Sequence, residues 1–376
     1  MRPRYEVADI FRLYGEDYRK THVMSPGQRK VMAAVMACRT ALLGGHSEIC
    51  DHCGTVKNHY NSCRNRHCPK CQAMTREEWL DKRKAELLPC GYFHLVFTVP
   101  HELNRLILAN RRALLSDLFQ AVRHTILAFA ADPRWRLEGK PGLLTVLHTW
   151  SQTLIDHFHI HCLIPAGVLS FDGKRWIKSN DGFLFRAQSL AKEFKKQYLS
   201  LIKGRLKQLT VPENSGSLLD LAGARTWIVY AKKPFAGPEQ VLEYLGRYTH
   251  RIAISNHRIK AVANGEVTFT YKDRRNKTTR TMTLSAMEFI RRFLLHVLPS
   301  RFMKIRYYGF LANICKKKSV LLIRGLIGKA MEVGNVVKET IREKMLRLTG
   351  RDILLCPHCR QGRMVRRGLL PALHTG

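Results

Sequence analysis

Two histidines at alternate positions are the first side chains in this sequence whose spacing suits chemistry. His159 and His161 lie in a stretch, residues 156–165, that is typical of a β-strand. Side chains two positions apart in a strand point to the same face, so the two imidazoles can bind one divalent metal ion. The other interpretation is a strand with a solvated polar face, and the pair alone does not decide between them.

Tyr244 and Tyr248 form the second candidate pair. A helix is predicted over residues 238–251, because Pro238 can open it and acidic residues occupy its first turn. Residues four apart on a helix share one face, so both phenols point the same way. Core packing is the commoner reason for such a pair, but the histidines upstream and a group of arginines favour chemistry here. These are Arg247, Arg251 and Arg258.

Together these residues suit reactions of a phosphodiester. A tyrosine hydroxyl can attack DNA phosphorus and hold the product as a covalent phosphotyrosine. A metal ion and arginines can stabilise the negative charge that develops on the phosphate oxygens. Because the phosphotyrosine bond keeps the energy of the broken link, a free 3′-hydroxyl can reverse the step. Two tyrosines would allow two successive strand transfers.

The cysteines indicate structural zinc. Cys50 and Cys53 are separated by fourteen residues from Cys68 and Cys71, which fits a single four-thiolate site. Cys63 or His67 lies close enough in the sequence to replace one ligand. Eleven cysteines arranged mainly in pairs do not suggest a disulfide framework, and they indicate a reducing cytoplasm.

A third cysteine pair lies near the C-terminus. Cys356 and Cys359 form half of a zinc site, and no further ligands are near them in the sequence. The alternatives are pairing with the N-terminal cysteines, with Cys315, or across a dimer, and a pair that binds nothing. The tail after Arg363 is basic and is predicted to be flexible.

The chain is strongly basic. Its 376 residues include 64 Lys and Arg against 29 Asp and Glu, which gives a formal net charge of +35. Such an excess repels itself in the compact state and suits a phosphate polyanion. The basic residues are spread along the sequence rather than placed on one amphipathic helix, which favours nucleic acid over a membrane surface. Arg64 and Arg66, within the cysteine-rich stretch, are candidate contacts to DNA, together with the three arginines near the tyrosines.

The order of the predicted elements indicates the fold class. Strand, helix, strand, strand, helix and strand follow one another at 92–99, 102–131, 142–150, 156–165, 183–209 and 226–230. This order predicts an α+β sandwich in which helices cover one face of a small, mainly antiparallel sheet. Elsewhere we expect helices within 5–43 with Ser25 as N-cap, a helix over 75–88, a loop at 211–223, and a hairpin at Asn264-Gly265.

The sequence shows no sign of a membrane span or a secretory signal. No stretch approaches the roughly 20 apolar residues of a membrane span, and the first residues lack the apolar region of a secretory signal. We therefore expect a cytoplasmic protein without a membrane partner.

The motif order resembles a known family. His159-Ile160-His161 followed by Tyr244-x-x-x-Tyr248 is similar to the HUH single-strand endonucleases that use a paired tyrosine. The strings SCRNRHCPKCQ at 62–72 and YLGRYTHRIAISN at 244–256 resemble the rolling-circle transposases of the IS91 insertion-sequence family. The resemblance extends from about residue 5 to Met364.

That resemblance implies an RRM-like HUH nuclease core, Mg²⁺ or Mn²⁺ as catalytic ion, and single-stranded DNA at transposon ends and targets as substrate. Transposition would pass through a 5′-phosphotyrosine intermediate. By the same likeness, His159 and His161 are metal ligands, and Tyr244 and Tyr248 are nucleophiles. The motif does not identify the third metal ligand, for which the candidates are His157, Gln152, His250 and Asn256.

The expected organisation has three parts. A helical and zinc-binding domain occupies 1–88, the nuclease domain 89–312, and a basic C-terminal region 313–376. Two other functions compete: a replication initiator would use the same chemistry, whereas a non-enzymatic zinc-finger protein would leave the paired histidines and tyrosines without a use. We expect a transposase associated with the bacterial nucleoid, and self-association stays open.

Overall fold

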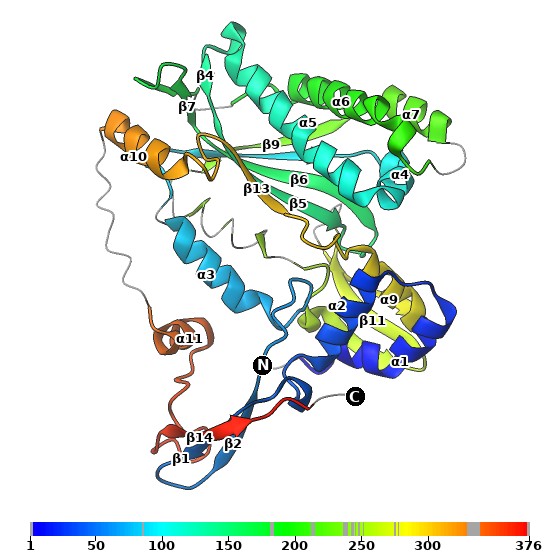
Figure 1. Cartoon of the computed structure of the whole chain (residues 1–376), viewed down its shortest axis with the longest axis vertical. Helices are drawn as coiled ribbons and strands as arrows, with labels where there is room; N and C mark the ends of the chain where they lie inside the picture. Colours follow the sequence, from blue (N-terminus) through cyan, green and yellow to red (C-terminus); the bar gives the residue numbers. More distant parts are fainter. Residues whose placement is uncertain are drawn as a thin grey trace.

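The computed structural model of the chain describes residues 3–84, 86–180, 184–211, 215–235, 240–241, 244, 246, 249–250, 252–273, 276, 278–328 and 339–373. Within these residues the strands form four sheets. The largest sheet lies in the upper part of the molecule, and the sheets that contain β11 and β1 lie in the lower part (Figure 1).

The largest sheet has five strands in the order β13-β5-β6-β3-β9, and each adjacent pair is antiparallel. Its strands are β3 (Tyr92–Thr98), β5 (Gly142–Trp150), β6 (Asp156–Pro165), β9 (Ile228–Phe235) and β13 (Ile305–Gly309). We number β3, β5, β6 and β9 from 1 to 4 in chain order. Read across the sheet from the β9 edge, their order is then 4-1-3-2. This is the antiparallel arrangement of a split β-α-β fold. β3, β5 and β6 lie where the sequence predicts them, whereas β9 begins two residues later than the predicted strand at 226–230 and extends to Phe235.

The two faces of this sheet differ because side chains alternate along each strand. Phe97, Leu147 and Ile160 point to one face and belong to a single buried core. The helices α5 (Arg111–Ala131) and α6 (Ala187–Gly204) contribute to the same core and lie along that face (Figure 1). The expected α+β arrangement, with helices on one face of an antiparallel sheet, is confirmed. The predicted metal-binding pair is on the opposite face.

The helix expected over 102–131 is interrupted. It begins as a 3₁₀ turn at His101–Leu103, continues as α4 (Asn104–Ala109) and restarts as α5. Asn110 breaks it, with φ −126° and ψ 40°, and its side chain exchanges two hydrogen bonds with the main chain of Thr210 at 2.7 and 2.8 Å. The apolar periodicity runs across this break, so the sequence pattern does not reveal it.

The loop predicted at 211–223 is wrong from residue 215 onward, where α7 (Ser215–Ala224) forms. Leu219 and Ala222 are buried in the main core, and the indole N–H of Trp227 donates to the carbonyl of Ala222 at 2.9 Å. Tertiary packing therefore outweighs the local preference of serine and glycine for a loop. β4 (Gly139–Lys140), β7 (Gly167–Ser170) and β8 (Trp176–Lys178) form a small sheet beside this core.

Segments far apart in the sequence share a second core. Buried residues of the two N-terminal helices pack with a three-stranded sheet and the helix that follows it. These elements are α1 (Val7–Thr21), α2 (Pro26–Ala37), β10 (Ile259–Ala263), β11 (Glu266–Lys272), β12 (Thr279–Ser285) and α9 (Ala286–Leu295). The hydroxyl of Ser25 accepts a hydrogen bond from the amide of Gln28 and so caps α2, as predicted. The hairpin is confirmed too, with Asn264 and Gly265 both at positive φ.

The first and last strands of the chain lie in one sheet. β1 (Gly45–Cys50) pairs with β2 (Val56–Tyr60) on one side and with β14 (Met364–Leu370) on the other. The flexible tail predicted after Arg363 is therefore wrong, because that tail is largely an antiparallel strand. Only Met364 is buried in this strand, so it lacks the apolar alternation by which a strand is predicted from sequence.

Among the described elements, α3 (Gln72–Lys84) and α10 (Lys316–Ile327) contribute to a smaller third core, and α11 (Ile341–Thr349) lies outside it. α3 begins three residues before the helix predicted over 75–88 and ends four residues before its predicted end. Ion pairs join α11 to α3, from Lys344 to Asp81 at 2.5 Å and from Arg347 to Glu77 at 3.3 Å. α3 is thus held from one side by the C-terminal part of the chain.

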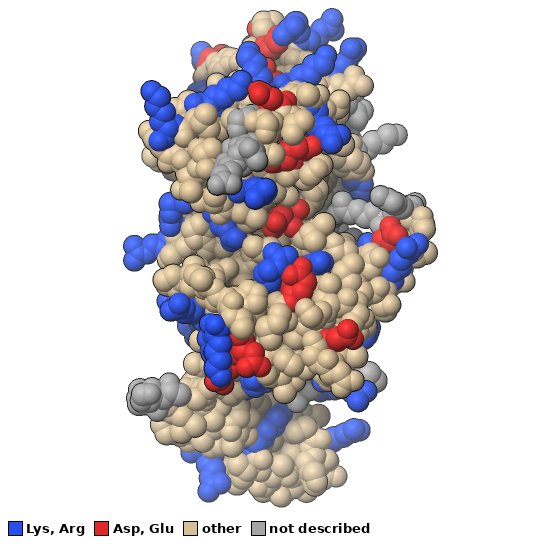
Figure 2. Space-filling view, turned by 90° about the vertical axis from the view of Figure 1, so that its right-hand side faces the viewer, with Lys and Arg blue, Asp and Glu red and all other residues tan. Residues whose placement is uncertain are grey.

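The basic excess is distributed over the surface. Figure 2 shows lysine and arginine side chains from one end of a face to the other, among fewer acidic groups. Among the described residues, no helix is both long enough and apolar enough to cross a bilayer.

We expect Gly309→Ala to destabilise the protein. Gly309 ends β13 with φ +62°, and a Cβ there would overlap the carbonyl oxygen of Pro141. The left-handed backbone alone costs about 1–2 kcal/mol for alanine, and the overlap adds to it. Gly325→Ala, in α10, is the control, because a Cβ there meets nothing within 4 Å. Urea denaturation midpoints should fall for the first variant and hold or rise for the second; equal midpoints would contradict this account.

Candidate functional site

Three imidazoles meet on the face of the central sheet that α5 and α6 leave uncovered. The ligand atoms of His148, His159 and His161 all lie within 4.8 Å of one another. The register of β5 and β6 brings them together, because it sets His148 opposite His159 and Val146 opposite His161. The two predicted histidines do share one face, and the third imidazole comes from the neighbouring strand.

Hydrogen bonds orient two of these rings. The Nδ1–H of His159 donates to the carbonyl of His157 at 2.8 Å, and Nδ1 of His161 lies 2.9 Å from Nε2 of His94. An imidazole fixed through one nitrogen presents the other to a metal ion. The cluster therefore has the donors for three-nitrogen coordination of a divalent ion.

Tyr244 is connected to this cluster through His94. Its hydroxyl lies 2.7 Å from Nδ1 and 2.8 Å from Nε2 of His94, on the same imidazole that contacts His161. Burial, followed by the charge of Lys232, lowers the pKa of His94 to about 4. His94 is therefore neutral at neutral pH. The Tyr244 hydroxyl thus contacts the neutral imidazole of His94, which in turn contacts His161 of the candidate metal site.

The four residues considered as third ligand lie outside the cluster. His157 contributes its carbonyl, as above, and the main-chain carbonyl of Gln152 accepts from Arg258. The Oδ1 of Asn256 accepts the amide of Val7 at 3.1 Å and so fixes the start of α1. His250 packs its ring 5.7 Å from that of Trp79.

Sequence reasoning missed His148 and His94. Both lie on predicted strands. Whether their side chains share a face with His159 and His161 depends on how the strands pair, which the sequence does not show. The register sets Val96 opposite His161, which places His94 on the same face two residues away. No local pattern encodes that register, although a histidine on each neighbouring strand was the available signal.

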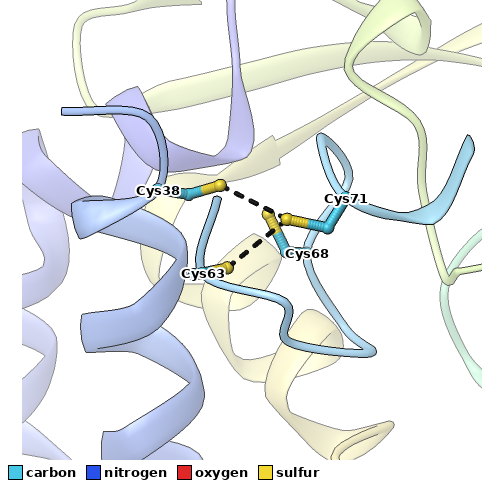
Figure 3. Close-up of side chains that lie close together, drawn as sticks. All are labelled: Cys38, Cys63, Cys68 and Cys71. Carbon is cyan, nitrogen blue, oxygen red and sulfur yellow. Dashed lines mark hydrogen bonds between the residues drawn. The ribbon is translucent and has the colours of Figure 1, made fainter. Parts of the chain in front are cut away.

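One cysteine cluster lies at the end of α2 and the start of α3. Cys38, Cys63, Cys68 and Cys71 point toward one another (Figure 3), and the sulfur of Cys71 lies 3.4 Å from that of Cys38 and 3.7 Å from that of Cys63. Tetrahedral zinc with bonds of about 2.3 Å places its sulfur ligands roughly 3.8 Å apart. The spacing fits a zinc tetrathiolate.

The two N-terminal cysteine pairs do not share a site. Cys50 and Cys53 lie with Cys356 and Cys359 in a second cluster, so the grouping expected from the sequence is wrong. The short spacing identifies each knuckle, but β1 and β2 carry the first pair away from the second. Of the two alternative ligands, Cys63 belongs to a cluster and His67 does not.

His67 instead lines a small internal cavity of roughly 20 Å³ with His296 and Lys304. Burial lowers the pKa of His67 to about 3 and that of Lys304 to about 8. Both side chains belong to the packing between the cysteine-rich stretch and the segment before β13, away from the cysteine sulfurs.

Two of the arginines predicted to contact DNA are held by the protein. Arg66 donates to the carbonyls of Phe302 and Pro299, and Arg258 to those of Thr270 and Gln152. Arg64 adopts a positive φ of 52° within the knuckle. Contact of these three with DNA stays a prediction, and Tyr248, Arg247 and Arg251 lie outside the described residues.

Known proteins resemble this chain over most of its length. The family described as "Transposase zinc-binding domain" matches residues 10–99, and the one described as "Putative transposase" matches residues 142–318. A Sinorhizobium fredii protein, "Putative transposase y4qJ", is 44% identical over 96% of this chain and 94% of its own length. The "Transposase for insertion sequence element IS801" of Pseudomonas savastanoi pv. phaseolicola is 29% identical over 83% and 78%. No solved structure matches.

We expect His148→Ala to weaken Mn²⁺ binding at least tenfold, since loss of an outer hydrogen-bond partner alone can cost about that much. His157→Ala is the matched control, because that imidazole is on the same sheet but outside the cluster. Titration with Mn²⁺ followed by electron paramagnetic resonance measures the affinity, after a chelator has removed the metal that is held outside the cysteine clusters, with circular dichroism as a check of folding. Equal affinities for the wild type and a folded His148→Ala would contradict the three-imidazole site.

Proposed function

Because the chain belongs to the IS91 family of insertion-sequence transposases, we propose that it cuts and rejoins single-stranded DNA through a 5′-phosphotyrosine intermediate. The contact of the Tyr244 hydroxyl with His94, and of His94 with His161, is the observation that carries this proposal. It supports a nucleophile and a metal site acting on one phosphate.

The central sheet supports an RRM-like HUH core for this activity. Four of its strands have the split β-α-β order, and α5 and α6 cover one face. The other face carries the imidazole cluster, in which His148 and His159 are buried, and in this proposal a DNA strand must reach that cluster to meet Tyr244. The basic surface would hold the phosphates on either side.

In the proposed reaction, the oxygen of a tyrosine forms a bond to phosphorus and the bond from phosphorus to the 3′-oxygen breaks. The phenol proton ends on the released 3′-hydroxyl, and the 5′-phosphate stays on tyrosine. A later attack by a free 3′-hydroxyl reverses the bonds and joins the strands. Tyr244 and Tyr248 are the proposed nucleophiles of two such steps.

His148, His159 and His161 would hold a divalent ion. When bound there, the ion would neutralise negative charge on the phosphate oxygens. Three imidazoles without a carboxylate suit Mn²⁺ better than Mg²⁺, which prefers oxygen ligands. We therefore propose that the site selects Mn²⁺ over Mg²⁺ at equal concentration.

His94 orients the nucleophile in this proposal. With a pKa of about 4, its imidazole is too weak a base to retain a proton at neutral pH. It can accept the hydrogen bond of the Tyr244 hydroxyl and so fix the direction of the oxygen. His94 is therefore a positioning residue.

Zinc has a structural role in this proposal. The chain contains a zinc-binding domain, and we propose that Cys38, Cys63, Cys68 and Cys71 are its ligands. These four join the end of α2 to the start of α3. Zinc there would fix the position of α3.

The test of the cleavage mechanism is a covalent-adduct assay. The protein is incubated with Mn²⁺ and oligonucleotides that carry the terminal sequences of its element, as single strands and as duplexes. We expect a protein–DNA adduct with single strands only, and no adduct for Tyr244→Phe/Tyr248→Phe. Tyr60→Phe, an exposed tyrosine on β2, is the control and should react as the wild type does.

An adduct that persists in the double variant would place the nucleophile elsewhere. DNA binding without an adduct at any terminal sequence would favour a DNA-binding protein without cleavage activity. Each single variant shows which tyrosine reacts first.

For His94→Ala we expect adduct formation to slow by roughly tenfold to a hundredfold, the effect of a misplaced reacting group. His94→Gln, which can still accept the phenol hydrogen bond, should recover part of the rate. Single-turnover rates at saturating DNA separate this effect from binding, which should be unchanged. Equal rates for His94→Ala and the wild type would show that the Tyr244–His94 contact has no role.

A further inference from the structure

The second cysteine cluster joins the two ends of the described chain. We propose that Cys50, Cys53, Cys356 and Cys359 bind a second zinc ion, which locks the β1–β2 hairpin to the C-terminal knuckle. No family match includes both pairs, because the zinc-binding match ends at residue 99. The proposal is independent of the DNA chemistry above.

The sulfur positions fit tetrahedral zinc. The sulfur of Cys50 lies 3.7 Å from that of Cys359, and the sulfur of Cys53 lies 3.7 Å from that of Cys356. Zinc–sulfur bonds of about 2.3 Å in a tetrahedron require roughly 3.8 Å between ligands. A disulfide requires about 2.05 Å, so both contacts match shared coordination and neither matches a covalent bond.

The two knuckles have the same local structure. In each, the residue after the second cysteine has a positive φ, +68° at Gly54 and +57° at Arg360. Its amide donates to the carbonyl of the first cysteine at 3.1 Å, Cys50 in one knuckle and Cys356 in the other. Two equivalent turns that face each other are the arrangement in which paired Cys-x-x-Cys knuckles bind zinc.

Amide hydrogen bonds reach the sulfurs as well. The amide of Cys53 donates to the sulfur of Cys50, and the amide of Gly362 donates to that of Cys359, both at 3.4 Å. Such donors stabilise the thiolate form, which is the form that coordinates metal. The ligands are thus oriented in advance.

The knuckles also interlock through Asp51. Its amide donates to the carbonyl of Arg363 at 3.1 Å, and its Oδ1 accepts the amide of Arg363 at 2.7 Å. Gly362 packs so closely that a Cβ there would lie 2.6 Å from the sulfur of Cys50. This fit leaves space for glycine only.

Apolar packing cannot account for the association. The buried core at this place consists of Cys50, Cys356 and Met364, and most of β14 is exposed. Three buried residues, two of them cysteines, are far fewer than a hydrophobic core needs. Small units of this kind depend on metal for their fold.

The metal content of the full-length protein tests the proposal. The count is made in a His159→Ala/His161→Ala background, because zinc would also occupy the imidazole cluster. Native mass spectrometry of this zinc-replete protein should show two zinc ions per chain. Cys356→Ser/Cys359→Ser and Cys50→Ser/Cys53→Ser should each retain one ion, because each removes half of the same site. Cys315→Ser, outside both clusters, is the control and should retain two.

The count in that background without a cysteine substitution decides the matter even if a cysteine variant fails to fold. One ion per chain there would overturn the second site, as would two ions in a folded Cys356→Ser/Cys359→Ser. Replacement of zinc by Co²⁺ gives an independent measurement, since thiolate-to-cobalt absorption per chain should halve in either double variant. Unchanged cobalt absorption would likewise overturn the proposal.

Discussion

The candidate site depends on the register of one antiparallel strand pair. β6 meets β5 so that His148 faces His159, and a slip of β6 by one residue would turn His159 and His161 toward the helices. Ile160 and Leu147 are fully buried on that other side. Burying such a side chain contributes about 1.5–3 kcal/mol, so several of them make the slip costly. The hydrophobic core thereby fixes the polar site on the opposite face, with no help from an ion.

α3 connects regions that are distant in the sequence. It begins directly after Cys71, and Arg83 near its end donates to the hydroxyl of Tyr307 in β13 at 2.7 Å. Leu80 packs against Gly246, two residues after Tyr244. A single helix therefore contacts the first cysteine cluster, the edge of the central sheet and the segment that carries the candidate nucleophile.

The sequence predicts features that are local. Alternation along β6 is sufficient to place His159 and His161 on one face, and the spacing of each cysteine pair is sufficient to identify a knuckle. Pairing between segments is not local, and there the sequence is insufficient. His148 and His94 enter the site through strand register and Cys38 enters its cluster through chain topology, and none of the three is predicted. The pairing of Cys356 and Cys359 with N-terminal cysteines is one of several alternatives that the sequence leaves open.

The misassigned elements have the same cause. α7 forms because Leu219 and Ala222 find a core, although the serines and glycines around them favour a loop. β14 forms because β1 offers an edge with which it can pair. The family resemblance, by contrast, rests on short motifs in a fixed order, and the comparisons with known transposases confirm it.

The contact between the N-terminal hairpin and the C-terminal knuckle affects how the chain folds during synthesis. Cys53 and Cys356 are 303 residues apart, and a ribosome adding about 5–20 residues per second needs roughly 15–60 s to span them. During that time the N-terminal hairpin lacks its partner strand β14. The apolar faces of α1 and α2 stay unpacked until β11 and α9 have been synthesised. Most of the chain must leave the ribosome before its beginning can settle. A nascent chain that stops early therefore exposes thiols and apolar helix faces, which are features that cellular quality control can recognise.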